Sequence, residues 1–299
     1  MELFFKAYGE VILAVFYTSK IIYTIEMSRK FKDVFKKDQN VVIGAVHFPP
    51  LLGYLEFPGI EIALENALFD LEVFQSNAFD AVIIENNYDS PHQEFVSPSV
   101  IASLTYLASK VKEKSTIPVG ISVLWNDYKT ALSISKIVGL DFIRIPVFVD
   151  TVKTSYGVVE GNSNDVIAYR KQIDAKNVLL FTDIHVKHSE ILSPYSLEES
   201  ASRAIESGSD ALILTGKWTG DMPNIEEMQS VRKTVEDFPI LCGSGVDEGN
   251  AQKLFSVSNG AIVSTSLKEG SVDSHEVNIK PYNQRISKDK VISFKDSIK

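Results

Sequence analysis

The chain has 299 residues, of which 44% are hydrophobic and 23% are charged, which is an ordinary globular composition. A net charge of -9 without a long basic run argues against nucleic-acid binding, although positive charge can still be concentrated in a cleft. The single cysteine, Cys242, excludes an internal disulfide and suits a reducing compartment. We therefore expect a cytoplasmic protein, with a peripheral-membrane or organellar location as the alternative.

Residues 1–27 differ from the rest of the chain, because they are apolar and aromatic. Interspersed charges such as Lys6, Glu10 and Lys20 leave no uncharged span of the roughly 20 residues that a transmembrane helix needs. The stretch also lacks the basic start and cleavage site of a secretory signal. We expect an extension that offers a peripheral membrane contact, followed by one domain over residues 28–280 and a polar tail over residues 281–299.

From Val41 onwards, short β-branched apolar runs alternate with longer segments of helical period. The expected strands are residues 41–46, 81–84, 118–123, 142–145, 178–183, 211–214, 240–242 and 261–263. The expected helices are residues 60–76, 98–113, 127–138, 164–173, 197–207, 225–236 and 248–255. Several strand runs are almost wholly apolar, which is typical of a parallel sheet buried on both faces.

Eight strands with alternating helices predict an α/β protein with the (β/α)8 architecture of a TIM barrel, for which about 250 residues is typical. The competing fold is a doubly wound open sheet, which would place a glycine-rich dinucleotide turn after the first strand. The segment from His47 to Gly53 has no such pattern. The barrel is therefore the preferred fold, and the sequence names no cofactor.

Polar residues collect after the predicted strands, where a barrel of this class carries its active site. Four of the five histidines lie in or near these ends, namely His47, His92, His185 and His188. Arg144 stands inside an apolar run and needs an anionic partner, such as Glu85, Asp127 or a ligand. The polar residues at the strand ends that we consider ligand contacts or catalytic groups are His47, Glu85, Asn126, Arg144, Thr215 and Gly216. Asn126 and its neighbour Asp127 also suit a helix cap.

The fifth predicted strand runs into the sequence Asp183-Ile184-His185-Val186-Lys187-His188. Strand alternation would place Asp183, His185 and Lys187 on one face. A carboxylate beside an imidazole fixes its tautomer and raises its basicity, which predicts an acid/base pair. The alternative is a strand that runs out into a solvated loop. A divalent metal site formed by Asp183, His185 and either His188 or Glu85 is also chemically reasonable. It is less favoured, because strand alternation would point His188 away from Asp183 and His185. Schiff-base chemistry at Lys187 or Lys217 is also less favoured, since it requires a desolvated lysine.

The seventh and eighth strand ends predict an anion site. Gly243, Ser244 and Gly245 precede an expected helix and offer bare backbone N–H groups. Ser264, Thr265 and Ser266 follow the eighth strand with hydroxyl donors, and Lys268 adds positive charge. Many barrels bind phosphate with the loops after strands seven and eight. The alternative is a tight turn that needs glycine only for its backbone shape.

These strand ends resemble the BtpA family, which includes a cyanobacterial photosystem I biogenesis protein. The resembling motifs are IGAVHFPPLLG (43–53), ENNYD (85–89), VLWND (123–127), FIR (142–144), GVVEG (157–161), DIHVKH (183–188), TG (215–216 and 219–220), GSGV (243–246) and TSLK (265–268). The chain departs from the family pattern at Leu52, Trp125 and Pro146, where Pro, Arg and Asn are usual. The resemblance implies a TIM-like barrel of the phosphate-binding kind, and it does not imply a reaction.

The combined prediction is an enzyme that acts on a small phosphorylated metabolite, either a sugar phosphate or a nucleotide-derived ligand, as a lyase, isomerase or hydrolase. His185 would be the general acid/base oriented by Asp183, and Glu85 the second acid/base or a ligand-hydroxyl acceptor. Lys187 or Arg144 would stabilise developing negative charge. The alternative is a non-catalytic assembly factor that binds a partner protein or a membrane surface. Homo-oligomer formation stays open in both cases.

Overall fold

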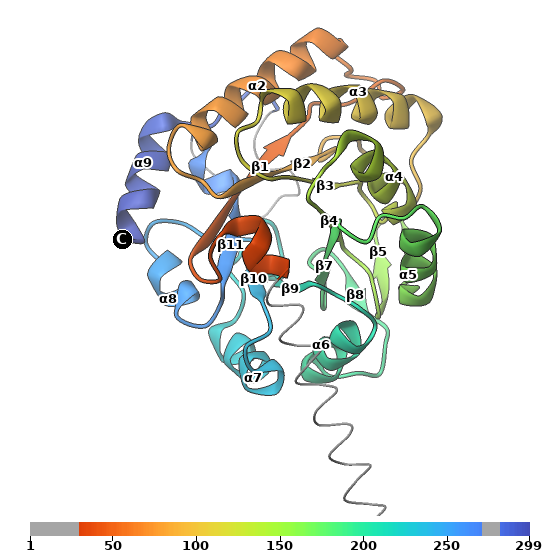
Figure 1. Ribbon diagram of the computed structural model, residues 1–299, viewed down its shortest axis with the longest axis vertical. Coiled ribbons are helices and arrows are strands. Elements are labelled where there is room, and N and C mark those ends of the chain that lie inside the picture. The colour runs from red at the N-terminus through yellow and green to blue at the C-terminus, as the bar shows by residue number, and fades with distance from the viewer. Residues whose placement is uncertain (1–29, 271–281) are drawn as a thin grey trace, which may run out of the picture.

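The computed structural model describes residues 30–270 and 282–299, so the expected extension over residues 1–27 lies outside the described residues. Eight parallel strands close into a barrel ringed by helices (Figure 1), which confirms the predicted TIM-barrel fold. In barrel order the strands are β1 (Val41–His47), β2 (Ala81–Glu85), β3 (Val119–Ser122), β4 (Phe142–Ile145), β7 (Leu179–Asp183), β9 (Ala211–Leu214), β10 (Ile240–Cys242) and β11 (Gly260–Val263), which pairs back with β1.

Helices separate the barrel strands at the predicted positions, with shifts of a few residues at their ends. They are α2 (Ile60–Gln75), α3 (Pro98–Lys114), α4 (Tyr128–Val138), α5 (Ser163–Gln172), α6 (Leu197–Glu206), α7 (Ile225–Val235) and α8 (Ala251–Phe255). Asp127 caps α4, because its side chain accepts a hydrogen bond from the backbone N–H of Thr130. Asn126 instead binds both the backbone N–H and the carbonyl of Val147, so it ties two loops together. None of the described helices is long and apolar enough to cross a membrane.

A second sheet was not predicted. Strands β5 (Thr151–Thr154), β6 (Gly157–Glu160) and β8 (Glu190–Ile191) form an antiparallel sheet in the order β6-β5-β8. Strands β5 and β6 make a hairpin that follows β4, and β8 follows β7. Because both insertions follow barrel strands, this sheet stands at the end of the barrel where those strands finish.

The segment over residues 282–299, expected to be a polar tail, contains helix α9 (Lys288–Ser297). Val291 and Phe294 are buried, and the Phe294 ring lies 6.3 Å from that of Phe79. Arg285, just before this helix, forms an ion pair of 2.9 Å with the buried Asp70 on α2. The tail therefore packs against the barrel. The sequence did not predict this, because Val291 and Phe294 stand among many lysines.

The barrel interior is apolar near the amino ends of the strands. Phe142 and Phe181 stack with ring centroids 4.6 Å apart. Phe31 and Phe35, from the helical residues 30–35, lie 5.9 Å from Phe181 and 5.8 Å from Phe142, respectively, and are buried with them. Strand alternation then places polar side chains one layer nearer the carboxyl ends. The structure thus has an apolar base under a polar mouth.

Gly120 on β3 gives the Phe142 ring its space, because an added Cβ would lie 2.2 Å from the ring. We expect Gly120→Ala to lower the free energy of unfolding by about 1–3 kcal/mol through overpacking. Urea unfolding measures this loss. Phe142→Leu in the same chain relieves the clash, so the double variant should lose less than the sum of the two single losses. Strict additivity would contradict the packing account.

Candidate functional site

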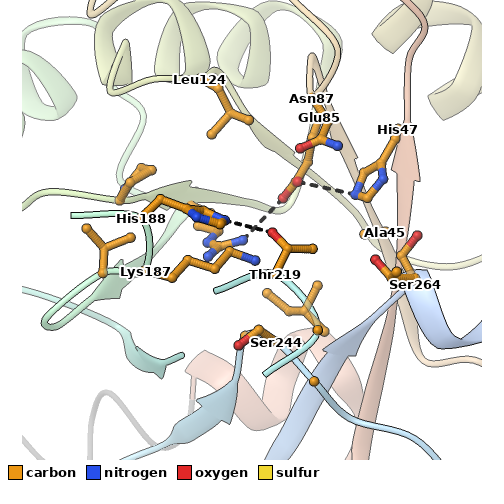
Figure 2. A pocket seen from close by; sticks show the side chains of 18 of the residues that line it. Ala45, His47, Glu85, Asn87, Leu124, Lys187, His188, Thr219, Ser244 and Ser264 are labelled. Carbon is orange, nitrogen blue, oxygen red and sulfur yellow. Dashed lines mark hydrogen bonds and ion pairs between the residues drawn. The ribbon is translucent and has the colours of Figure 1, made fainter. Parts of the chain in front are cut away.

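A cavity of about 280 Å3 opens at the carboxyl ends of the barrel strands (Figure 2). Its wall collects residues from around the barrel, including His47 on β1, Glu85 on β2 and Arg144 on β4. The predicted site residues that line it are His47, Glu85, Arg144, Lys187, Gly243, Ser244, Gly245, Thr265 and Ser266. The predicted residues that do not line it are Asn126, Asp183, His185, Thr215 and Gly216.

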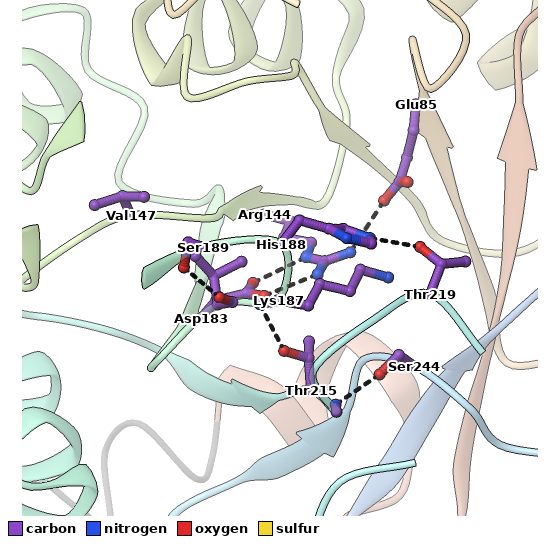
Figure 3. Close-up of polar contacts among 12 residues, drawn as sticks. Glu85, Arg144, Val147, Asp183, Lys187, His188, Ser189, Thr215, Thr219 and Ser244 are labelled. Carbon is purple, nitrogen blue, oxygen red and sulfur yellow. Dashed lines mark hydrogen bonds and ion pairs between the residues drawn. The ribbon is translucent and has the colours of Figure 1, made fainter. Parts of the chain in front are cut away.

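Arg144 organises the charges at the cavity floor (Figure 3). Its Nε lies 2.9 Å from Oδ1 of Asp183, and its Nη2 lies 2.8 Å from Oδ2. Its Nη1 lies 3.5 Å from Oε1 of Glu85. All three side chains are buried, so the bidentate pair with Asp183 is a strong, directional contact. The expected pairing with Glu85 is therefore present but long, and Asp183 is the main partner.

The expectation that Asp183 orients His185 is wrong. Both Asp183 oxygens are taken by Arg144, and Nε2 of His185 lies instead 3.4 Å from Oγ of Ser200 on α6. Strand β7 ends at Asp183, so alternation no longer applies beyond it. His185 has a positive φ of 49°, which turns the backbone and directs the side chain away from the cavity.

His188, which was out of phase in the sequence pattern, does line the cavity (Figure 2). Its φ of 60° turns the chain a second time, and its Nε2 lies 2.7 Å from Oγ1 of Thr219. Its Nδ1 is buried and has no hydrogen-bond partner in the described part of the chain. His188 therefore presents a polar atom that a ligand can satisfy.

Thr215 and Gly216 support the cavity wall from behind. Oγ1 of Thr215 accepts a hydrogen bond of 2.9 Å from the backbone N–H of Lys187. The Gly216 N–H donates to Oγ of Ser244, whose hydroxyl donates in turn to the carbonyl of Asp221. These contacts fix the loops after β7, β9 and β10 relative to one another. The Ser244 hydroxyl is thus occupied by the protein, and only its backbone N–H remains for a ligand.

Unused hydrogen-bond donors gather where β10 and β11 end. The backbone N–H groups of residues 244–246 and 265–266 form no hydrogen bond with any described residue. Oγ of Ser264 is buried and equally without a partner in residues 30–270 and 282–299. Lys187 and Lys268 line the same cavity. Free amides beside positive charge can bind an anion, and a buried donor without a partner is costly unless a ligand satisfies it.

The histidines of the cavity are held neutral. Burial lowers the pKa of His47 well below its ordinary value, and the positive charges of Lys268 and Lys187 lower it further. Burial also lowers the pKa values of His92 and His188 to about 4. Nε2 of His47 lies 3.6 Å from Oε2 of Glu85. A neutral imidazole beside a carboxylate can accept and pass on a proton.

Lys187 differs from the other cavity lysine. Burial lowers its pKa to about 8, and the charge of Arg144 adds to the effect. Lys268 is buried against Tyr88, with its Nζ 3.1 Å from the phenol oxygen and 5.2 Å from the ring centroid. One lysine is therefore held in the wall, and the other extends into the cavity (Figure 2).

Several cavity residues were not among the predicted site residues, namely Tyr88, His92, Tyr156, His188 and Thr219. Tyr156 comes from the turn of the β5–β6 hairpin and packs edge-on against His92, with ring centroids 5.5 Å apart. The β-branched runs on either side of Tyr156-Gly157 were the available signal for this hairpin. Trp125 and Pro146, where the chain departs from the family pattern, both line the cavity.

Within residues 30–270 and 282–299, no group of three or more His, Cys, Asp and Glu side chains is arranged to hold a metal ion. The less favoured metal set of Asp183, His185 and His188 or Glu85 is thus not assembled. Asp183 binds Arg144, His185 faces α6, and His188 binds Thr219.

The fold and the site define a (β/α)8-barrel protein with a charged cavity at the carboxyl ends of its strands. The chain belongs to the BtpA family, whose model matches residues 38–290, and this confirms the resemblance in the sequence. An uncharacterized protein of Archaeoglobus fulgidus is 37% identical over 80% of this chain and 96% of its own length. The photosystem I biogenesis protein BtpA of Synechocystis sp. is 34% identical over 79% of this chain and 84% of its own length.

Solved structures support the fold. Phosphoribosyl anthranilate isomerase from Thermus thermophilus superposes with a TM-score of 0.53, covering 86% of this chain and 98% of the isomerase. The sequences are only 10% identical, so this likeness shows a shared barrel and nothing about the reaction.

Proposed function

We propose that this protein is an enzyme that acts on a small phosphorylated metabolite, either a sugar phosphate or a nucleotide-derived compound. The observation that carries the proposal is the buried Oγ of Ser264, which has no partner among the described residues and lines the cavity. It stands beside the unused amides of residues 244–246 and 265–266. A phosphate group supplies several acceptor oxygens and negative charge, so it would satisfy all of these donors together.

The reacting part of the ligand would then lie over Arg144 and Glu85, away from the loops that hold the phosphate. Glu85 and the neutral His47 are the acid/base pair in this proposal, because they are 3.6 Å apart and both line the cavity. Arg144 would stabilise negative charge that develops on the ligand. A cavity of about 280 Å3 is near the lower end of the usual range for ligand sites, which suits a small metabolite.

Ser264→Ala tests the phosphate position. We expect the unliganded melting temperature to be unchanged or slightly raised, because the variant loses a buried hydroxyl that has no partner in the described part of the chain. Affinity for the phosphorylated ligand should fall by about tenfold or more, the value of one hydrogen bond to a charged group. A thermal-shift screen with inorganic phosphate, sugar phosphates and nucleoside monophosphates measures both quantities.

Ser135→Ala is the matched control. Oγ of Ser135 on α4 is also buried without a partner among the described residues, but Ser135 does not line the cavity. This variant should keep the full ligand-induced shift. Equal ligand-induced shifts of the melting temperature in the parent and the Ser264 variant would show that the phosphate does not bind at Ser264. If no phosphorylated compound raises the melting temperature, the proposal of an enzyme acting on a phosphorylated metabolite is contradicted.

The second candidate is a non-catalytic assembly factor that binds a partner protein or a membrane surface. It is favoured by the similarity to the Synechocystis protein, whose name assigns it to photosystem I biogenesis. The similar protein in an archaeon speaks against a role confined to that complex. Liposome co-sedimentation of the full chain and of a chain without residues 1–26 separates the candidates. Membrane binding that is lost on truncation would favour the assembly role.

A further inference from the structure

We propose that Lys187 is a nucleophile that forms an imine with the carbonyl carbon of its ligand. This narrows the substrate class to phosphorylated aldehydes and ketones. The phosphate part of this assignment rests on the proposed function, whereas the amine chemistry of Lys187 can be tested without it.

The placement of the Lys187 side chain is the first observation. Its backbone N–H is fixed by Thr215, and the side chain extends into the cavity beside Arg144 (Figure 3). In the described part of the chain, Nζ makes no hydrogen bond and no ion pair. The carboxylates nearest to it are engaged by Arg144, which takes both oxygens of Asp183 and one of Glu85.

The protonation of this amine is the second observation. A lysine that only binds anions functions best with its charge retained, and an ion pair with a carboxylate would secure that charge. Here burial and the neighbouring Arg144 lower the pKa of Lys187 to about 8. A substantial fraction of the amine is therefore neutral near physiological pH, and neutral amines attack carbonyl carbons.

Two other lysines at the same mouth show what is particular to Lys187. Lys268 is held against Tyr88 in the wall, so its amine is already engaged. Lys217 is exposed to solvent and does not line the cavity. Among these three lysines, only Lys187 combines a position inside the cavity with an unengaged amine.

The proposed step balances within the site. The neutral amine forms a C–N bond while the carbonyl π electrons move to oxygen, and loss of water then breaks the C–O bond and forms C=N. Counted from the ammonium, Lys187 gives up two protons that leave with the carbonyl oxygen as water, and nitrogen keeps the positive charge. His47, which is neutral, and Glu85 beside it would carry these protons between nitrogen and oxygen.

The iminium product withdraws electrons from its neighbouring carbon. A C–H or C–C bond next to the former carbonyl carbon can then break, with the electron pair moving toward nitrogen. Hydrolysis by water reverses the attachment and restores the lysine. This chemistry favours a lyase or an isomerase over a hydrolase.

Reductive trapping tests the proposal with the intact protein. Glycolaldehyde phosphate and glycolaldehyde are each added with sodium cyanoborohydride, which reduces an imine to a stable secondary amine, and peptide mass spectrometry locates the adduct. We expect Lys187 to be modified about tenfold faster than Lys217, because burial lowers the pKa of Lys187 to about 8 and a neutral amine is the nucleophile. The rate at Lys187 should rise as the pH passes about 8.

The outcomes separate this proposal from the phosphate site. Faster modification by the phosphorylated probe, reduced by inorganic phosphate, supports both. Equal modification of Lys187 by the two probes, with no effect of inorganic phosphate, supports imine formation and contradicts the proposed phosphate site. Modification of Lys187 no faster than that of Lys217 overturns the imine, whether or not phosphate binds. Lys187→Arg removes the primary amine and should abolish trapping at this position.

Discussion

Replacement of Arg144 by methionine is expected to lower the free energy of unfolding by about 3–5 kcal/mol, the usual loss when one partner of a buried ion pair is removed. Asp183 and Glu85 would remain in the barrel interior without their cation, and both side chains are almost fully buried. Guanidinium unfolding at neutral pH measures the loss.

A second substitution separates lost packing from unpaired charge. Asp183→Asn removes the charge that makes the bidentate contact with Arg144. In the Arg144→Met background it should restore part of the lost stability, because a buried neutral amide costs less than a buried carboxylate without a partner. Arg170→Met is a further control: its buried pair with Asp210 lies outside the cavity, so ligand binding should survive. An Arg144 variant as stable as the parent would contradict this account.

Phe181→Ala is expected to cost a similar amount, about 3–5 kcal/mol, because it leaves a cavity in the apolar base of the barrel. The Phe181 ring is fully buried and lies against three others, with centroids 4.6 Å from Phe142, 5.9 Å from Phe31 and 6.0 Å from Phe35. Urea unfolding measures the loss. The ligand-induced thermal shift should persist, since this layer lies beneath the polar mouth.

Phe181→Leu is the matched variant, because it fills most of the same volume. It should lose clearly less stability than the alanine variant. Nearly equal losses would mean that the ring contacts, and not the filled volume, stabilise the base. A loss below about 1 kcal/mol in the alanine variant would mean that the rings of Phe31 and Phe35 move in to fill the space.

The barrel could be predicted because its signal repeats. Each strand is a short β-branched run, and Arg144, which stands inside one of them and was expected to need an anionic partner, pairs with Asp183 and Glu85. Strand alternation failed two residues after β7. His185 and His188 adopt positive φ values, and their side chains are held by Ser200 and Thr219. Such loop conformations depend on distant contacts, which periodicity does not describe.

The prediction of the anion site was limited for the same reason, namely that contacts between loops cannot be read from sequence periodicity. Glycine spacing and strand order identified the loops after β10 and β11, and both line the cavity. The sequence could not show which hydroxyl is free, because that depends on the neighbouring loops. Ser244 is occupied by Gly216 and Asp221, whereas Ser264 has no partner among the described residues. Two serines of equal promise in the sequence thus differ in what they offer a ligand.

The small antiparallel sheet has a consequence for how such barrels diversify. Strand β5 belongs to the loop after β4, and β8 belongs to the loop after β7, yet Val152 pairs with Ile191 and Lys153 with Glu190. Tyr156 at the hairpin turn and Lys187 before β8 both line the cavity. The two loops therefore form one structural unit. A loop graft that exchanges only one of them would break its strand register, so we expect recombination between relatives to succeed when both loops are exchanged together.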